Sequence, residues 1–192
     1  MPSDPHEPHR RTIRLQDYDY SQPGSYFVTI CTQGRKWLFG NVIDGEMHLN
    51  TVGTIAQSIW LTLPNRFPHI ELDQYVIMPN HLHGIITIVG AQLIAPAGGS
   101  GGAKADSIGR PHPAASTGAI NCAPTLGKMI RAYKAVATSQ IRSTVKADFQ
   151  WQRDYYEHIV RKDGDLDHIR QYIVDNPARW TEDSLYREGT SW

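Results

Sequence analysis

The chain has 192 residues, of which 40% are hydrophobic and 20% are charged, enough to bury one core and hardly enough for two. Its 19 lysines and arginines balance its 19 aspartates and glutamates, so it lacks the global positive field of a histone-like or polybasic binder. The two cysteines, Cys31 and Cys122, have no CxxC spacing. They argue against a disulfide scaffold and a zinc ribbon and favour a reducing compartment.

The N-terminus carries no sign of a targeting segment. Residues 1–8 contain three prolines and no apolar stretch, so neither a signal peptide nor a mitochondrial presequence is expected. The longest apolar run, residues 84–91, is far shorter than the roughly 18–20 residues of a membrane span. We therefore expect a cytoplasmic protein with no membrane partner.

The first third of the chain alternates between strand-like and helical patterns. Residues 1–12 are expected to form a disordered lead. β-Branched and aromatic residues at 26–32 predict a strand, and a short strand is expected at 46–49. Asn50 is a candidate N-cap for a helix whose apolar residues recur every three or four positions until Pro64 ends it.

Two longer strands follow, at residues 70–78 and 81–89, separated by a Pro-Asn turn. The second run is apolar on both faces, as in a central strand that is covered on each side. Residues 91–123 are rich in Gly, Ala, Pro and Ser. They predict a flexible insertion, because such a stretch buries too little apolar surface to offset the entropy lost on ordering.

The last third is mainly helical. Residues 125–143 have one apolar face, and a final helix is expected at 163–176 with Pro177 just beyond it. Between the two helices, residues 149–151 predict a short strand or turn, whereas residues 155–160 are assigned to neither a helix nor a strand.

The order β-β-α-β-β-α-α predicts an α+β fold: a ferredoxin-like antiparallel sheet with helices packed on one face. We expect a single domain over residues 13–180, interrupted by the insertion at 91–123. Residues 181–192 are then a C-terminal tail.

The sharpest chemical signal is the His81-Leu82-His83 motif on a predicted strand. Because side chains alternate along a strand, His81 and His83 share one face while Leu82 points into the core. Two imidazoles with this spacing can bind one divalent cation. Two histidines near a turn are also often merely solvated or hydrogen-bonded, so the motif alone leaves both interpretations open.

The second signal lies on the final helix, where Tyr172 and Asn176 are one turn apart. Both flank the apolar stripe of that helix, so a phenol and an amide oxygen lie side by side. A tyrosine at the edge of an apolar stripe is often only a packing residue.

Together, these motifs resemble those of the Y1 family of HUH single-strand DNA transposases, in particular the REP-associated tyrosine transposases. Residues 76–85 are similar to the family's strand with its His-hydrophobic-His motif, and residues 172–177 (Tyr-Ile-x-x-Asn-Pro) are similar to its nucleophile helix. Supporting likenesses lie at residues 14–20, 26–29 and 151–153. The resemblance covers about residues 11–180 apart from the insertion.

This resemblance implies a catalytic mechanism. Tyr172 would attack the scissile phosphate to form a 5′-phosphotyrosine, and His81, His83 and Asn176 would hold Mg²⁺ or Mn²⁺, which helps the 3′-hydroxyl leave. The insertion-sequence branch of the family typically carries Gln where Asn176 stands. The implied activity is that of a metal-dependent endonuclease and strand transferase, a transposase.

The implied partner is single-stranded or hairpin DNA of the REP or BIME type, bound by a monomer in a bacterial cytoplasm. The polar face of the helix at 125–143 could follow a DNA backbone, although it could equally be an ordinary solvated surface, and aromatic side chains could stack on unpaired bases. The candidate DNA-binding residues are Lys128, Arg131, Lys134, Arg142, Tyr18, Tyr20 and Trp37.

Two other functions remain open. One is a domesticated DNA-hairpin binding protein with a regulatory or architectural role, and the other is an unrelated metal hydrolase that uses His81 and His83. Tyr155 and Tyr156 are alternative nucleophiles, although neither has an Asn four residues further on.

Overall fold

The computed structural model describes residues 19–89 and 125–186. The expected lead at 1–12, Tyr18, the expected insertion and the last six residues of the expected tail lie outside these ranges. In chain order, the elements are β1 (Gly24–Cys31), η1 (Gln33–Arg35), β2 (Gly40–Ile43), β3 (Glu46–Leu49), α1 (Thr51–Leu61), α2 (Leu63–Arg66), β4 (Ile70–Met78), β5 (His81–Ile88), α3 (Leu126–Thr144), β6 (Tyr156–Val160), α4 (Asp163–Asp175) and η2 (Trp180–Glu182).

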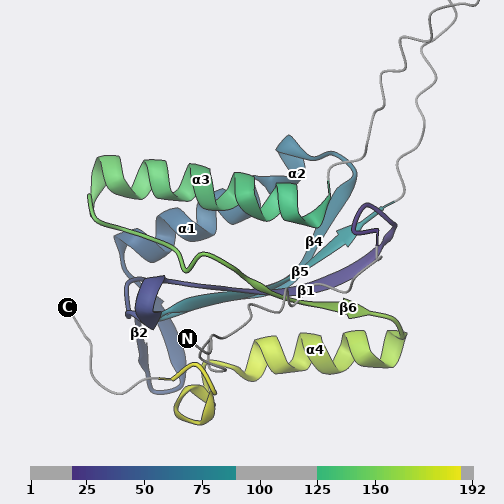
Figure 1. The fold of residues 1–192 in the computed structure, drawn as a ribbon. Helices are drawn as coiled ribbons and strands as arrows, with labels where there is room; N and C mark the ends of the chain where they lie inside the picture. The colour runs from purple at the N-terminus through teal and green to yellow at the C-terminus, as the bar shows by residue number, and fades with distance from the viewer. Residues whose placement is uncertain (1–18, 90–124, 187–192) are drawn as a thin grey trace, which may run out of the picture.

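The central feature is a four-stranded sheet in the order β4-β5-β1-β6, with every neighbouring pair antiparallel (Figure 1). A separate hairpin joins β2 to β3. The predicted α+β class with an antiparallel sheet is confirmed. The edge strand β6 was not predicted, because its five residues give too short an alternation to identify a strand.

The main core lies on the face of the sheet that α1 and α3 cover. Leu82 and Ile86 of β5 point into this core, together with Trp60 of α1 and Tyr133 of α3. As predicted, α1 begins after Asn50, whose side-chain oxygen accepts a hydrogen bond from the Gly53 N–H at 3.0 Å. Among the described residues, no helix is both long and apolar enough to cross a membrane.

The opposite face carries a smaller core formed with α4. Buried Phe27, Ile85 and Ile173 form its centre, and Leu166 and Ile169 of α4 pack against them. The expectation that all helices pack on one face is therefore wrong for α4 (Figure 1). The physical reason is that the second face of the sheet also carries apolar side chains, Phe27 of β1 and Ile85 of β5, which need a cover.

Helix α1 and the sheet approach each other closely at Gly84 in the middle of β5. A Cβ atom at this position would lie 2.5 Å from Cζ2 of Trp60, which is itself fully buried. Only glycine lets α1 approach the sheet this closely, so Gly84 sets the spacing of the main core.

We predict that Gly84→Ala lowers the free energy of unfolding by about 1–3 kcal/mol, because the added methyl group overpacks the core against Trp60. Urea denaturation measures the change. Gly164→Ala in the first turn of α4 is the matched control. Its Cβ atom meets nothing within 4 Å, so we expect stability to stay level or rise by up to about 1 kcal/mol. Equal stability of Gly84→Ala and wild type would contradict the packing argument.

Candidate active site

The two histidines of β5 lie on the face of the sheet that α4 covers. His81 is 0% and His83 is 3% exposed, and their ring centroids are 4.3 Å apart. Leu82 between them is buried in the main core on the other face. The predicted alternation along this strand is therefore confirmed.

A hydrogen-bond network fixes the orientation of His81. The side-chain amide of Asn80 donates from Nδ2 to the carbonyls of Arg35 at 3.2 Å and Leu185 at 2.9 Å. These two bonds turn Oδ1 of Asn80 toward His81, whose Nδ1 lies 2.7 Å away. Because Oδ1 can only accept, Nδ1 of His81 carries the proton and Nε2 keeps its lone pair.

His83 is oriented by β1. Its Nδ1 lies 2.8 Å from the hydroxyl Oγ1 of Thr29, which is buried beside it. When Nδ1 donates this bond, Nε2 of His83 also keeps a lone pair that points toward α4. Thr29 and Asn80 are thus outer residues that hold both rings in the orientation required of ligands.

Tyr172 of α4 lies next to this pair, as the sequence analysis expected. Its hydroxyl is 3.3 Å from Nε2 of His83, and its ring is edge-on to Phe27 at a centroid distance of 6.2 Å. The side chain is 44% exposed, so a substrate can reach the hydroxyl from solvent. Burial of the rest of the ring and the nearby Asp183 carboxylate raise the pKa of Tyr172 to about 12.

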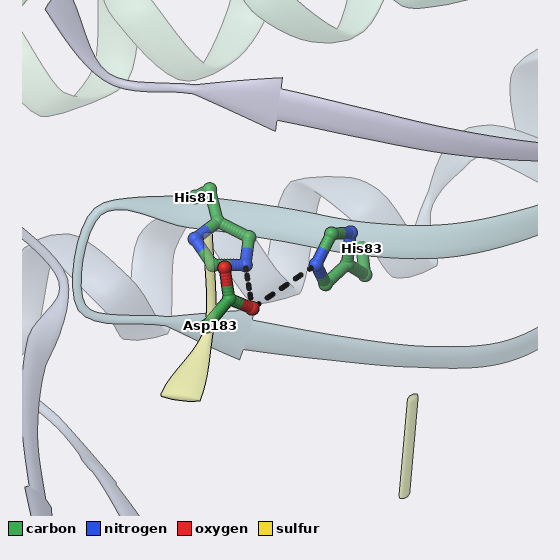
Figure 2. A group of neighbouring side chains, drawn as sticks. All are labelled: His81, His83 and Asp183. Atoms are coloured by element: carbon green, nitrogen blue, oxygen red, sulfur yellow. Dashed lines mark ion pairs between the residues drawn. The ribbon is translucent and has the colours of Figure 1, made fainter. Parts of the chain in front are cut away.

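The structure adds one residue that the sequence analysis did not consider. Asp183 follows η2, in the segment expected to be a tail, and its side chain is 2% exposed. Its Oδ2 lies 4.0 Å from Nε2 of His81 and 3.9 Å from Nε2 of His83, as Figure 2 shows. The hydroxyl of Tyr172 donates to the same oxygen at 3.4 Å.

Asp183 is held in place by an aromatic cluster and by a backbone N–H two residues further along the chain. The rings of Trp37, Trp180 and Tyr186 pack on one another with centroid distances of 5.2–5.7 Å. The Leu185 N–H donates to Oδ1 of Asp183 at 2.6 Å. No local spacing in the sequence links Asp183 to the histidines, which explains why pattern reasoning missed it.

Asn176 reaches the site through Asp183. Its Nδ2 donates to Oδ2 of Asp183 at 2.9 Å, whereas its Oδ1 is buried and has no hydrogen-bond partner among the described residues. The sequence analysis expected this amide oxygen as a metal ligand. The structure brings Asn176 into the cluster, and its role as a ligand stays a prediction.

Burial controls the charges in the cluster. Desolvation and the neighbouring His83 hold the pKa of His81 well below its usual value, and desolvation also lowers the pKa of His83. Burial opposes ionisation of Asp183, but the hydrogen bonds that it accepts from the Asn176 amide and the Leu185 N–H favour the carboxylate, and the pKa of Asp183 is lowered. The result is two neutral imidazoles facing a carboxylate.

This donor set suits a divalent cation. The ligand atoms of His81, His83 and Asp183 all lie within 4.8 Å of one another. In addition, the buried Nε2 of His81 has no hydrogen-bond partner among the described residues. Two ligands of one ion with bonds of about 2.1 Å are at most about 4.2 Å apart. The two histidine–aspartate separations of 4.0 and 3.9 Å are within that distance, whereas the whole set spans up to 4.8 Å, so the ligand atoms must move slightly closer together to bind one ion.

The basic residues expected on α3 lie across the sheet from this cluster (Figure 1). Nζ of Lys134 donates to the carbonyls of Gln152 at 2.6 Å and Arg153 at 3.0 Å, and Nε of Arg142 donates to the carbonyl of Phe149 at 2.8 Å. Both side chains thus stabilise the loop before β6. Their predicted contact with DNA, and that of Lys128 and Arg131, stays a prediction.

The aromatic candidates are also placed. Tyr20 packs against the main core, with its ring centroid 6.1 Å from that of Tyr26. The alternative nucleophile Tyr156 is 48% exposed on β6. The hydroxyl of Tyr172, by contrast, makes a hydrogen bond to the histidine pair.

Comparison with known proteins identifies one relative of this chain by sequence and one solved structure with the same fold. No family model matches it. A protein of Haemophilus influenzae, named only as uncharacterized, is 38% identical over 178 residues, 93% of each chain. The two proteins belong to one family.

A solved REP-associated tyrosine transposase bound to a REP hairpin has 18% sequence identity and a TM-score of 0.53. The match covers 87% of this chain and 74% of that one. At this level of identity the likeness shows the fold, and the chain has the fold of that transposase.

We predict that Mn²⁺ binds this cluster and stabilises the protein. At a concentration of about 100 times Kd, the free energy of unfolding should rise by about 2.7 kcal/mol. His81→Ala, His83→Ala and Asp183→Ala should each lose most of this gain, as measured by calorimetric titration and thermal denaturation. His48→Ala on β3, an exposed histidine away from the cluster, should respond like wild type. Unchanged Mn²⁺ binding in the first three variants would contradict the site.

We also predict that Thr29→Val weakens Mn²⁺ binding about tenfold, because His83 loses the hydrogen bond that orients its ring. Thr87→Val is the control, since Thr87 lies on the same face of β5 but bonds to Ser25 at 2.9 Å, away from the histidines. The measurement is again calorimetric titration. If both variants bind Mn²⁺ like wild type, Thr29 does not orient His83.

Proposed function

We propose that this protein is a metal-dependent endonuclease and strand transferase, a transposase that acts on single-stranded or hairpin DNA with Tyr172 as the nucleophile. One observation carries the proposal. The Tyr172 hydroxyl lies 3.3 Å from Nε2 of His83 and 3.4 Å from Oδ2 of Asp183. The fold thus places a candidate nucleophile, Tyr172, beside a candidate cation site that includes His83, although the two residues are 89 positions apart in the chain.

The proposed residues have distinct roles. His81, His83 and Asp183 hold Mg²⁺ or Mn²⁺, with the Asn176 oxygen as a further candidate ligand. The bound cation would polarise a non-bridging oxygen of the scissile phosphate and stabilise the departing 3′-oxygen. Phe27 and His83 support the Tyr172 ring from the sheet side and leave its hydroxyl directed at the cluster.

The bonds balance in a single displacement. The phenolic oxygen of Tyr172 forms a bond to phosphorus, and the bond from phosphorus to the 3′-oxygen breaks, which leaves a 5′-phosphotyrosine and a 3′-hydroxyl. The phenolic proton passes to water, because Tyr172 is 44% exposed. One phosphodiester replaces another, so the strand can be rejoined without ATP.

This reversibility favours strand transfer over hydrolysis. A metal hydrolase would activate water and would not require a tyrosine at its cation site. The solved relative was bound to a REP hairpin, which supports a hairpin of the REP or BIME type as the substrate. We further propose that the protein acts as a monomer in the bacterial cytoplasm.

We predict that Tyr172→Phe abolishes covalent protein–DNA adducts and leaves hairpin binding within about twofold of wild type, because the phenyl ring keeps its packing while the attacking oxygen is removed. The assay uses labelled hairpin oligonucleotides with randomised single-stranded flanks, Mn²⁺ or Mg²⁺, and denaturing gels. Tyr75→Phe is the control, because Tyr75 packs against the main core on the other face of the sheet.

Several results would reject this assignment. Adducts that persist in Tyr172→Phe but vanish in Tyr156→Phe would move the nucleophile to β6. Cleavage retained by His81→Ala would remove the histidine pair from the mechanism. Hairpin binding without any adduct in either metal would instead favour a regulatory or architectural DNA-binding protein.

A further inference from the structure

A cleft of about 450 Å³ opens beside Tyr172, a volume within the range of small-molecule sites. Residues of β1, β5, β6, α4 and the turn after β1 line it, among them Arg35, His83, Tyr156 and Tyr172. The cleft therefore begins at the candidate nucleophile and extends along the sheet toward its β6 edge.

A second pocket, of about 230 Å³, is also lined by Tyr172. Its lining includes Asp175, Glu182 and Asp183, while its arginine, Arg179, pairs with Glu182 at 3.0 Å. Apart from Asp183, which is assigned to the cation site, the carboxylates of Asp175 and Glu182 make this pocket unfavourable for a further phosphate. Of the two, the larger cleft is the better site for a segment of DNA backbone.

Arg35 supplies the positive charge of the larger cleft. Its backbone is held in the left-handed region at φ 55°. Its N–H donates to Thr32 at 3.0 Å and its carbonyl accepts from Asn80 at 3.2 Å. Within residues 19–89 and 125–186, no hydrogen bond or ion pair engages its guanidinium. The network that orients His81 thus also fixes the base of a side chain whose charged end is available to a ligand.

Tyr156 supplies an aromatic surface. It pairs with Thr29 across the β1–β6 ladder, so it lies one strand away from the residue that contacts His83. The side chain is 48% exposed on an edge strand. An exposed aromatic ring that lines a cleft beside a positively charged side chain is the usual stacking surface for an unpaired base.

The cleft also contains one carboxylate, that of Asp154. Lys134 lies against the same loop, with Nζ 3.5 Å from the Asp154 carbonyl, and attracts the Asp154 carboxylate electrostatically. The negative charge of Asp154 is therefore partly balanced from outside the cleft, whereas no acidic side chain pairs with Arg35 in the described residues.

We propose that this cleft binds the unpaired nucleotide that adjoins the scissile phosphate. Arg35 contacts a phosphate oxygen of that nucleotide and Tyr156 stacks on its base. This inference rests on the proposed function, which places the scissile phosphate at Tyr172. It assigns Arg35 and Tyr156 as substrate-binding residues.

The test measures DNA binding without cleavage. The probe is a fluorescein-labelled oligothymidylate of about twelve nucleotides, titrated in EDTA at several salt concentrations and followed by fluorescence anisotropy. We expect Arg35→Gln to weaken binding at least about fivefold and to reduce the salt slope by about 0.7, the value for one phosphate contact on a single strand. Arg35→Lys should restore the slope, because it keeps the charge.

Tyr156→Ala should weaken binding about tenfold, and Tyr156→Phe, which keeps the ring, should bind like wild type. Arg66→Gln removes one positive charge from α2 on the other face of the sheet and is the control for net charge. Because Arg35→Lys and Tyr156→Phe preserve charge and ring, respectively, they separate the binding roles from damage to the fold.

The inference is overturned if wild type does not bind the probe at about 50 mM salt, if Arg35→Gln binds like wild type, or if Arg66→Gln weakens binding as much. The proposed function fails separately. Arg35-dependent binding by a protein that forms no Tyr172 adduct would uphold the cleft and reject the transferase. Adduct formation together with Arg35-independent binding would uphold the transferase and reject the cleft as the nucleotide site.

Discussion

The packing of α4 onto the second face of the sheet is the interaction on which the candidate site depends. Its contact is small, built on Phe27, Ile85 and Ile173, yet it brings Tyr172 within 3.3 Å of His83. An additional link ties the helix to β4, because Arg170 donates to Asp73 at 2.6 Å. The larger core on the other face contributes most of the buried apolar surface, while this smaller one sets the geometry of the chemistry.

The histidines are oriented by residues that also support the neighbouring cleft. Asn80 bonds to His81, to the Arg35 carbonyl and to the Leu185 carbonyl, so one buried amide joins the ligand pair, the turn after β1 and the segment that carries Asp183. A site assembled from so many elements holds its geometry only when the whole fold is formed. This is why an outer residue such as Asn80 affects chemistry that it does not touch.

The sequence predicts the parts of the site that depend on local periodicity. Alternation along β5 puts His81 and His83 on one face, and helical spacing puts Tyr172 and Asn176 on one flank of α4. The sequence does not reveal Asp183, because its approach depends on long-range contacts of Trp37, Trp180 and Tyr186. Likewise, the positive charge of Lys134 indicated a contact with DNA. In the fold, its Nζ binds carbonyls of the loop before β6, and no local sequence pattern predicts that this loop lies beside it. The position of α4 was predicted wrongly for the same reason, because it depends on long-range contacts among Phe27, Ile85 and Ile173.

The energetics of the cluster also favour a bound cation. Nε2 of His81 and Oδ1 of Asn176 are buried without hydrogen-bond partners among the described residues, and each such group costs about 1–3 kcal/mol of stability. The Asp183 carboxylate lies 3.9 and 4.0 Å from the two imidazole nitrogens, too far for a hydrogen bond. A fold that only needed stability would fill this space with apolar side chains, as it does around Ile85 on the same strand. Here, instead, imidazole lone pairs and a carboxylate converge without bonding to one another, and a positive ion between them would stabilise this arrangement. The groups that weaken the metal-free fold would therefore give the site its affinity for the cation.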